Sequence, residues 1–269
     1  MLDRVEAPDN LTAIAGARIE LSERGSGRPL LLLHPAIGIR PTDPVIDALA
    51  RSFRVLVPSH PGFGRSELPR AMTTVDDLAY FYLDFMDALD LHDLVLAGIS
   101  FGGWIAAEIA IKSTARISHL VLADAVGIKL GGREQRDIAD VFTLRQDEVD
   151  RRAYHDPKLA AVDHTKISDD DALIMFRNRE AAALFAWSPY MHDPKLAGRL
   201  HRIRVPTLFL WGASDRIVSP DYGRAYAKLI AGAQFELIEQ AGHYPHLERP
   251  DLFAQRIGDF VARTQAGAG

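Results

Sequence analysis

The chain has 269 residues, of which 48% are hydrophobic and 25% charged, and this is enough apolar material for one sizeable folded core. Its formal net charge of −5 provides no basic surface of the kind that nucleic acid or an anionic membrane requires, so we expect neither as a partner. The lack of cysteine in the sequence excludes disulfides, thiolate metal sites and a cysteine nucleophile.

The first residues, MLDRVEAPDN, are charged and lack the apolar stretch of a secretion signal. No apolar run in the sequence approaches the roughly 18 residues that a membrane-spanning helix needs. We therefore expect a cytoplasmic protein.

Short apolar runs alternate with helix-length segments along most of the chain. The first predicted strand lies within residues 17–25 and forms a hairpin with a neighbouring strand. Further strands are predicted within residues 28–35, 53–60, 91–100, 117–125, 205–214 and 233–240. Helices are predicted over Val75 to Leu89, after the cap residue Thr74, and over Phe101 to Lys112. Aliphatic strands that alternate with helices indicate a largely parallel sheet with helices on both faces.

The alternation stops between residues 128 and 204, where several amphipathic helical stretches follow one another without a clear strand. We interpret this segment as an all-α cap that is inserted after the sixth strand and lies over the carboxyl edge of the sheet. The predicted domain organisation is therefore a core formed by residues 1–127 and 205–269, with a cap at 128–204.

One predicted strand leads directly into Gly98-Ile99-Ser100-Phe101-Gly102, and a helix follows. A strand, a Gly-x-Ser-x-Gly motif and a helix form the context of a nucleophile elbow, in which small residues let the two backbones approach around a strained serine. The N-terminus of the helix favours negative charge that develops beside Ser100. Serine also caps helices, but a complete set of catalytic partners favours a nucleophile.

A serine hydroxyl needs a histidine base and a carboxylate that orients the histidine. His243 follows the last predicted strand in a loop that contains glycine and proline, and Asp215 follows the strand before it. Both loops leave the same edge of the sheet as Ser100. Asp124 follows an earlier strand and is the alternative acid, although the chain order Ser, Asp, His favours Asp215.

His243, His246 and Glu248 are also residue types that bind metals. Pro245 lies between the two histidines and disrupts the helical spacing that a zinc motif needs. We therefore expect no metal, and we expect no cofactor because the chain has no dinucleotide-binding fingerprint.

These segments resemble the α/β-hydrolase family, and the resemblance covers nearly the whole chain. The similar stretches are LLLLHPAIG (30–38), HPGFGRS (60–66), GISFGG (98–103), WGASDRIV (211–218) and AGHYPHLERP (241–250). The resemblance implies a mostly parallel, eight-stranded sheet flanked by helices, and a catalytic triad of Ser100, Asp215 and His243. It also implies an oxyanion hole formed by the backbone N–H groups of Ala36 and Phe101.

Two positions depart from the pattern of the family. Pro35 stands where many members have glycine, which stiffens the oxyanion loop, and Ser59 stands where many have aspartate. Neither departure removes a catalytic group. His34 is expected to be a structural member of the oxyanion loop that borders the substrate.

A serine nucleophile disfavours the branches of this family that use aspartate, which are the dehalogenases and epoxide hydrolases. The remaining chemistry is acyl transfer, and the first interpretation is a serine esterase or lactonase that acts on a small molecule. The alternative is a carbon–carbon hydrolase that acts on meta-cleavage-type diketones, in which a cap arginine holds a substrate carboxylate and an aromatic residue lies beside the catalytic histidine. Arg177 and Tyr244 are the candidates for these two roles.

Apolar residues of the predicted cap, among them Trp187, are candidates to line an acyl or aryl pocket, although their spacing is also typical of the cap's own core. A function of another class stays open, because the same fold includes weakly catalytic small-molecule receptors, and cofactor-free oxygenases and perhydrolases use the same three residues. The sequence leaves the substrate and the presence of a homo-oligomer undecided.

Overall fold

The computed structural model describes residues 11–132, 134–160 and 167–266, and it contains an eight-stranded sheet in the order β1-β2-β4-β3-β5-β6-β7-β8. The strands are β1 (Leu11–Ile14), β2 (Ala17–Arg24), β3 (Pro29–Leu33), β4 (Arg54–Pro58), β5 (Leu94–Ile99), β6 (Ile117–Ala123), β7 (Thr207–Gly212) and β8 (Gln234–Ile238). β1 pairs antiparallel with β2, and β2 with β4, whereas the other neighbours are parallel. The predicted mostly parallel, eight-stranded sheet is confirmed.

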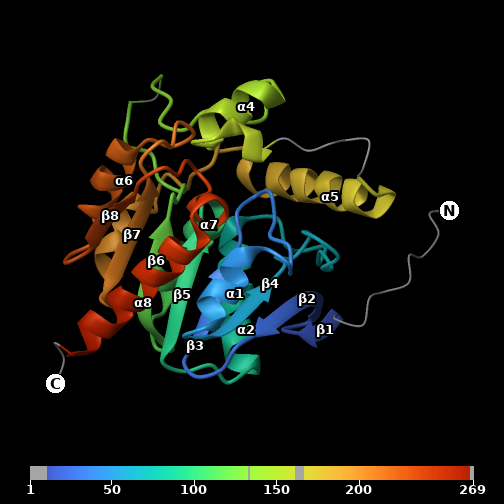
Figure 1. Cartoon of the computed structure of the whole chain (residues 1–269). Helices are drawn as coiled ribbons and strands as arrows, with labels where there is room; N and C mark the ends of the chain where they lie inside the picture. The colour runs from blue at the N-terminus through green and yellow to red at the C-terminus, as the bar shows by residue number, and fades with distance from the viewer. Residues whose placement is uncertain (1–10, 133, 161–166, 267–269) are drawn as a thin grey trace.

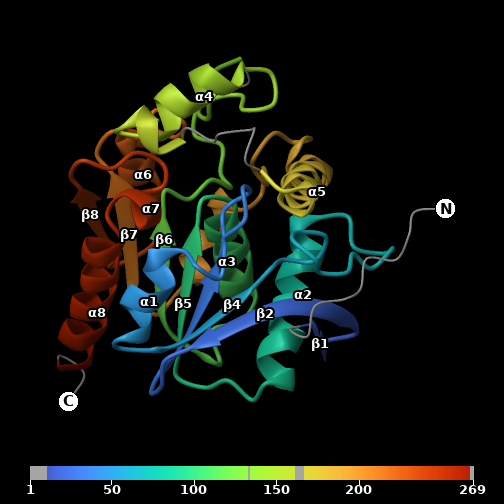
Figure 2. The ribbon, with the colours of Figure 1, turned by 45° about the vertical axis from the view of Figure 1, so that its right-hand side comes forward.

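Helices cover both faces of this sheet. Helices α2 (Val75–Ala88), α3 (Phe101–Lys112) and α6 (Pro220–Ala227) pack on one face, and α1 (Pro44–Ala50) and α8 (Pro250–Ala266) on the other. The described residues also form α4 (Gln146–Ala153), α5 (Asp169–Ala186) and α7 (Pro245–Glu248). In β3, Leu31 and Leu33 face a core shared with α2, α3 and α6, whereas Leu30 and Leu32 face a core shared with α1 and α8. Figures 1 and 2 show the two helical layers with the sheet between them. Burial on both faces explains why the strand is an unbroken aliphatic run.

Two helices begin where the sequence predicts them. The Thr74 hydroxyl accepts a hydrogen bond from the N–H of Asp77, and the Asp77 carboxylate accepts one from the N–H of Thr74, so this capping box starts α2. α3 covers Phe101 to Lys112, which is the predicted range. Among the described residues, no helix is both long and apolar enough to cross a bilayer.

Residues 128–204, the helical segment, connect β6 to β7. The described part of this segment forms α4, α5 and two short 3-10 helices, η1 (Pro157–Ala160) and η2 (Ala197–Arg202), and no strand. Isolated bridges join Gly127 to His192 and Ile138 to Val218. α4 and α5 lie beyond the end of the sheet toward which the parallel strands point (Figures 1 and 2). The boundaries of a separate cap domain, at residues 128 and 204, stay a prediction.

Candidate active site

Ser100 occupies the turn between β5 and α3 in a backbone conformation that few residues adopt. Its φ is 52° and its ψ is −111°. Such a conformation costs on the order of 1–3 kcal/mol and persists only where the surrounding structure fixes it. The N–H of Ser100 donates to the carbonyl oxygen of Ala123 at 2.8 Å, which ties the turn to the end of β6. This is the geometry expected of a nucleophile elbow.

The glycines of the motif let the start of α3 approach both β3 and β5. A Cβ atom added at Gly102 would lie 2.1 Å from the carbonyl oxygen of Leu33, and one added at Gly98 would lie 2.2 Å from that of Gly102. Real Cβ atoms do not approach so closely, so the backbone would have to move. We expect Gly102→Ala to lower the free energy of unfolding by about 2–4 kcal/mol, as measured by denaturant titration.

Gly258 in α8 is the matched control for this substitution. A Cβ atom added there meets no heavy atom of the described residues within 4 Å. We expect Gly258→Ala to raise the free energy of unfolding by about 0.5–1 kcal/mol, because alanine favours the helix. A similar change in both variants would contradict the close approach at the elbow.

The three residues predicted as a triad form a continuous chain of hydrogen bonds. His243 Nε2 lies 2.7 Å from Ser100 Oγ, and His243 Nδ1 lies 2.8 Å from Asp215 Oδ2. Because Nδ1 faces a carboxylate, it carries the ring proton, and Nε2 accepts the serine hydroxyl. Asp215 Oδ1 accepts the N–H groups of Ile217 at 2.8 Å and Val218 at 3.1 Å. This arrangement can remove the serine proton while it holds the imidazole in one orientation.

The loop that carries His243 is held by the helical segment. The N–H of His243 donates to the carbonyl oxygen of Ala153 at 2.6 Å. The Glu248 carboxylate accepts the N–H of Gly242 at 2.6 Å and two N–H groups just after α4 at 3.0 and 3.1 Å. The sequence suggested Glu248 only as a metal ligand, and no pattern in it identifies these backbone partners.

Asp124, at the end of β6, lies beside this chain of hydrogen bonds but outside it. Its Oδ1 accepts the N–H of Gly212 at 2.9 Å, whereas its buried Oδ2 has no partner among the described residues. Burial, and then the charge of Asp215, raise the pKa of Asp124 well above the ordinary 3.8, which favours a neutral carboxylic acid. The structure therefore brings Asp215, and not the alternative Asp124, to His243.

Asp124, Asp215 and His243 also form a cluster of metal-ligand types, with one atom of each within 4.8 Å of the others. Both ring nitrogens of His243 already have partners in the hydrogen-bonded chain. A metal ion would have to displace one of them, so these residues fit acid–base chemistry better than metal binding. His246 is buried with neither ring nitrogen partnered in the described part of the chain.

The loop predicted to supply one oxyanion donor is fixed by two stacked histidines. The N–H of His60 donates to His34 Nε2 at 2.9 Å, so His34 carries its proton on Nδ1, which donates to the carbonyl oxygen of Pro35 at 2.8 Å. The Tyr82 hydroxyl donates to His60 Nδ1 at 2.5 Å. Burial lowers the pKa of His34 to about 4 and the pKa of His60 well below 6.5, so both rings are neutral. Sequence reasoning identified neither His60 nor Tyr82.

These hydrogen bonds determine the direction of the Ala36 N–H. The carbonyl oxygen of Pro35 accepts His34 Nδ1 at 2.8 Å and the N–H of Gly38 at 2.8 Å. In a trans peptide the C=O and the following N–H point in opposite directions. The Ala36 N–H therefore points away from His34 and Gly38.

The other predicted site residues lie in different surroundings. The Tyr244 ring packs edge-on against His243, with the ring centroids 5.0 Å apart. Arg177, on α5, donates through Nη2 to the carbonyl oxygen of Ser66 at 2.9 Å. Trp187 follows α5 and its side chain is 56% exposed. The structure thus brings Tyr244 to the triad and Arg177 to the loop after β4, whereas Trp187 lies at the surface.

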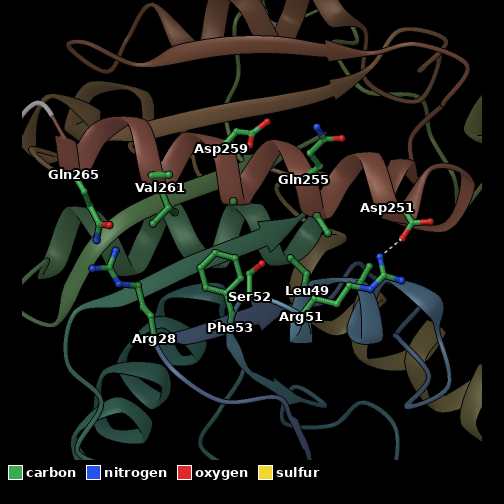
Figure 3. A pocket seen from close by; sticks show the side chains of 14 residues that line it. Arg28, Leu49, Arg51, Ser52, Phe53, Asp251, Gln255, Asp259, Val261 and Gln265 are labelled. Carbon is green, nitrogen blue, oxygen red and sulfur yellow. Dashed lines mark hydrogen bonds and ion pairs between the residues drawn. The ribbon is translucent and has the colours of Figure 1, made fainter.

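Two surface hollows lie apart from the hydrogen-bonded chain. One of about 520 Å³ lies between α1 and α8, and an ion pair of 2.8 Å between Arg51 and Asp251 borders it (Figure 3). Another of about 390 Å³ lies against the helical segment and includes Trp187 in its wall. Neither hollow is lined by Ser100 or His243.

A comparison with protein families matches residues 30–256 to the family described as "Alpha/beta hydrolase family". The chain belongs to the α/β-hydrolase family. The matched range contains every residue of the predicted triad and oxyanion hole. The sheet order and the position of the elbow after β5 agree with this assignment.

This α/β-hydrolase is 30% identical to the 2-hydroxymuconate semialdehyde hydrolase of Pseudomonas sp. (strain CF600), over 98% of this chain and 99% of that protein. Among solved structures, it is similar to the meta-cleavage product hydrolase CumD from Pseudomonas fluorescens IP01, with a TM-score of 0.74, 22% identity and 93% and 96% of the two chains covered. It is also similar to an esterase from Thermogutta terrifontis, with a TM-score of 0.69, 26% identity and 94% and 97% covered. The chain is a hydrolase, and carbon–carbon cleavage, the alternative reading of its sequence, is supported better than ester cleavage.

Proposed function

We propose that this α/β-hydrolase cleaves a carbon–carbon bond in a small 2-hydroxydienoate that carries an aldehyde or ketone at C6, the class that includes 2-hydroxymuconate semialdehyde. The observation that carries the proposal is the 30% identity to a hydrolase of that compound over 98% of the chain. The hydrogen-bonded Ser100, His243 and Asp215 supply the acid–base and nucleophilic groups that the reaction needs.

The C5–C6 bond of such a substrate becomes breakable after one proton moves. His243 Nε2 accepts the proton of the C2 enol and delivers it to C5, which converts C2 to a ketone conjugated with a C3–C4 double bond. When the C5–C6 bond then breaks, its electron pair is delocalised onto the oxygen at C2. The leaving fragment is therefore a stabilised dienolate.

Ser100 Oγ attacks the C6 carbonyl while His243 takes the hydroxyl proton, and the N–H groups of Ala36 and Phe101 hold the resulting oxyanion. Collapse of this intermediate breaks C5–C6, the dienolate takes the proton from His243, and an acyl group stays on Ser100. Water that His243 deprotonates then attacks the acyl carbon, which releases a carboxylic acid and restores Ser100. Overall, one water is consumed for each bond cleaved.

The C1 carboxylate of the substrate needs a cation, and we assign this role to Arg177. One of its nitrogens donates to Ser66 at 2.9 Å, which leaves other N–H groups of the guanidinium for a carboxylate. Tyr244 packs against His243 and would border the dienyl chain. Burial raises the pKa of Tyr244, so its hydroxyl stays neutral beside the reacting carbons.

We expect the purified chain to consume 2-hydroxymuconate semialdehyde with a kcat/KM at least about 100-fold above that for p-nitrophenyl butyrate, as followed by absorbance. Arg177→Met should raise KM for the dienoate by about 10-fold, because it removes the cation, and should change KM for the uncharged ester by less than about 3-fold. Arg179→Met, an exposed neighbour on α5, is the control. An equal effect of Arg177→Met on both substrates would contradict the carboxylate role.

Hydrolysis of an ester or lactone is the second candidate. It is favoured by the similarity to the esterase from Thermogutta terrifontis, at 26% identity and a TM-score of 0.69. The same three catalytic residues serve both reactions, so only the ratio of kcat/KM for the two substrates separates them. A faster reaction with the ester than with the dienoate would favour this second candidate. Covalent labelling of Ser100 without turnover of either substrate would favour a receptor.

A further inference from the structure

Asn178 is a buried polar residue in a helix whose opposite face is exposed. Its side chain is 6% exposed, whereas that of Phe176 is 72% exposed. A buried amide is stabilised only where its polar atoms find partners. Nδ2 donates to the carbonyl oxygen of Ile37 at 3.0 Å, and Oδ1 accepts the N–H of Gly64 at 2.8 Å. One side chain of α5 therefore joins the loops that follow β3 and β4.

These two loops each adjoin one proposed oxyanion donor. Ile37 directly follows Ala36. Gly64 directly follows Phe63, whose ring centroid lies 5.7 Å from that of Phe101. A displacement of either loop would therefore reach a residue that is proposed to donate its N–H to the oxyanion.

The contact at Ile37 completes the support of the oxyanion loop. On one side of Ala36, the carbonyl oxygen of Pro35 is held by the ring of His34. On the other side, the carbonyl oxygen of Ile37 is held by Asn178. A Cβ atom added at Gly38 would lie 2.5 Å from Asn178 Nδ2, so the loop backbone and the amide are in direct contact.

We propose that Asn178 is a positioning residue that aligns the Ala36 N–H with the oxyanion. Because Asn178 belongs to α5, this alignment depends on the position of α5 against the loops after β3 and β4. Donors of an oxyanion hole stabilise the transition state only when they are held in place before the charge develops. Loss of Asn178 therefore lowers kcat more than it raises KM. The inference rests on the serine mechanism of the proposed function, and it holds for a dienoate or an ester.

The test compares two substitutions on the same helix. Asp170 also links α5 to the loop after β4, because it pairs with Arg65, but it makes no hydrogen bond or ion pair with the described residues of the oxyanion loop. We expect Asn178→Ala to lower kcat by about 10- to 100-fold with less than about a 3-fold change in KM, on each substrate that the wild type accepts. Asp170→Asn should keep both constants within about 2-fold of the wild type.

Asn178→Asp separates the two hydrogen bonds of the amide. The carboxylate keeps an acceptor for Gly64 but has no donor for Ile37, so we expect its kcat to fall as far as that of Asn178→Ala. Circular dichroism melts of both variants check that each is folded at the assay temperature. An Asn178→Asp variant with the kcat of the wild type would overturn the role of the contact with Ile37.

The rate of covalent labelling by a fluorophosphonate supplies a second readout, because the phosphonyl oxygen occupies the oxyanion hole during the reaction. We expect Asn178→Ala to be labelled at least about 10-fold more slowly than the wild type, and Asp170→Asn at the rate of the wild type. A wild type that is not labelled would overturn the serine mechanism. If the wild type is labelled and Asn178→Ala is labelled as fast as Asp170→Asn, the role of Asn178 is overturned, whereas the serine mechanism is not.

Discussion

Ser100→Ala is expected to lower kcat at least about 1000-fold, for dienoate and ester alike, because no acyl group can then form on the chain. The substitution removes a hydroxyl that lies 2.7 Å from His243 Nε2 and leaves the rest of the hydrogen-bonded chain intact. Turnover is measured by absorbance. Mass spectrometry after fluorophosphonate treatment should detect one phosphonyl group on the wild type and none on the variant.

Ser113→Ala is the control, since Ser113 lies at the opposite end of the same helix. We expect its kcat to stay within about 2-fold of the wild type, as is usual for a surface substitution. Labelling of Ser100→Ala at the rate of the wild type would show that the nucleophile lies elsewhere. If Ser100→Ala is not labelled but keeps the turnover of the wild type, water attacks the substrate directly and no acyl-enzyme forms.

Asp215→Asn is expected to lower kcat by about 1000- to 10,000-fold, because the amide does not stabilise the imidazolium and favours the wrong tautomer of His243. Asp124→Asn is expected to stay within about 3-fold of the wild type, because the amide oxygen still accepts the N–H of Gly212 and its NH₂ group can donate to Asp215. Steady-state kinetics of the two variants compare the two carboxyl groups directly. Equal losses would mean that Asp124 shares the role of triad acid.

The burial of Asp124 beside Asp215 predicts that the stability of the folded chain depends on pH. In the folded chain the pKa of Asp124 is raised above 3.8, so the folded state keeps a proton that the unfolded state releases. Above the unfolded pKa, the wild type therefore loses stability as the pH rises, until the folded pKa is passed. The amide introduced by Asp124→Asn does not titrate, so this loss is absent from the variant. The Tm of Asp124→Asn relative to the wild type should increase between about pH 4 and pH 7.

The elements around the nucleophile could be predicted from the sequence because local patterns determine them. Gly98 is needed where β5 approaches α3 and Gly102 where α3 approaches β3, and the observed range of α3 is the predicted one. The positions of Asp215 and His243 follow from the rule that loops after parallel strands meet at one edge. Three short motifs were thus enough to indicate residues that the fold brings within hydrogen-bond distance.

The residues that support the site could not be predicted, because their partners are distant backbone groups. Asn178 and Gly64 are separated by 114 residues, and Glu248 binds N–H groups more than 90 residues away. His60 acts on the oxyanion loop through the ring of His34. Such contacts depend on which loops lie side by side in the folded chain, and neither residue spacing nor hydrophobic periodicity predicts them.

The sequence motifs also do not distinguish ester hydrolysis from carbon–carbon hydrolysis. Both reactions need a nucleophilic serine, a histidine that moves protons and an oxyanion hole, so the same residues serve either one. The two reactions differ in the groups that recognise the substrate, and Arg177, the proposed carboxylate ligand, lies in a part of the chain without a sequence motif. Arg177 is the residue whose expected role differs most between the two hypotheses.

The backbone contacts between the helical segment and the catalytic loops have a consequence for protein engineering. The carbonyl oxygens of Arg152 and Ala153 accept the N–H groups of Arg216 at 3.0 Å and His243 at 2.6 Å. A chimera that takes residues 128–204 from another hydrolase would replace these acceptors together with Arg177, the proposed carboxylate ligand. A graft that keeps residues 150–156 of this chain would exchange the rest of the helical segment and preserve the backbone support of the loop that carries His243.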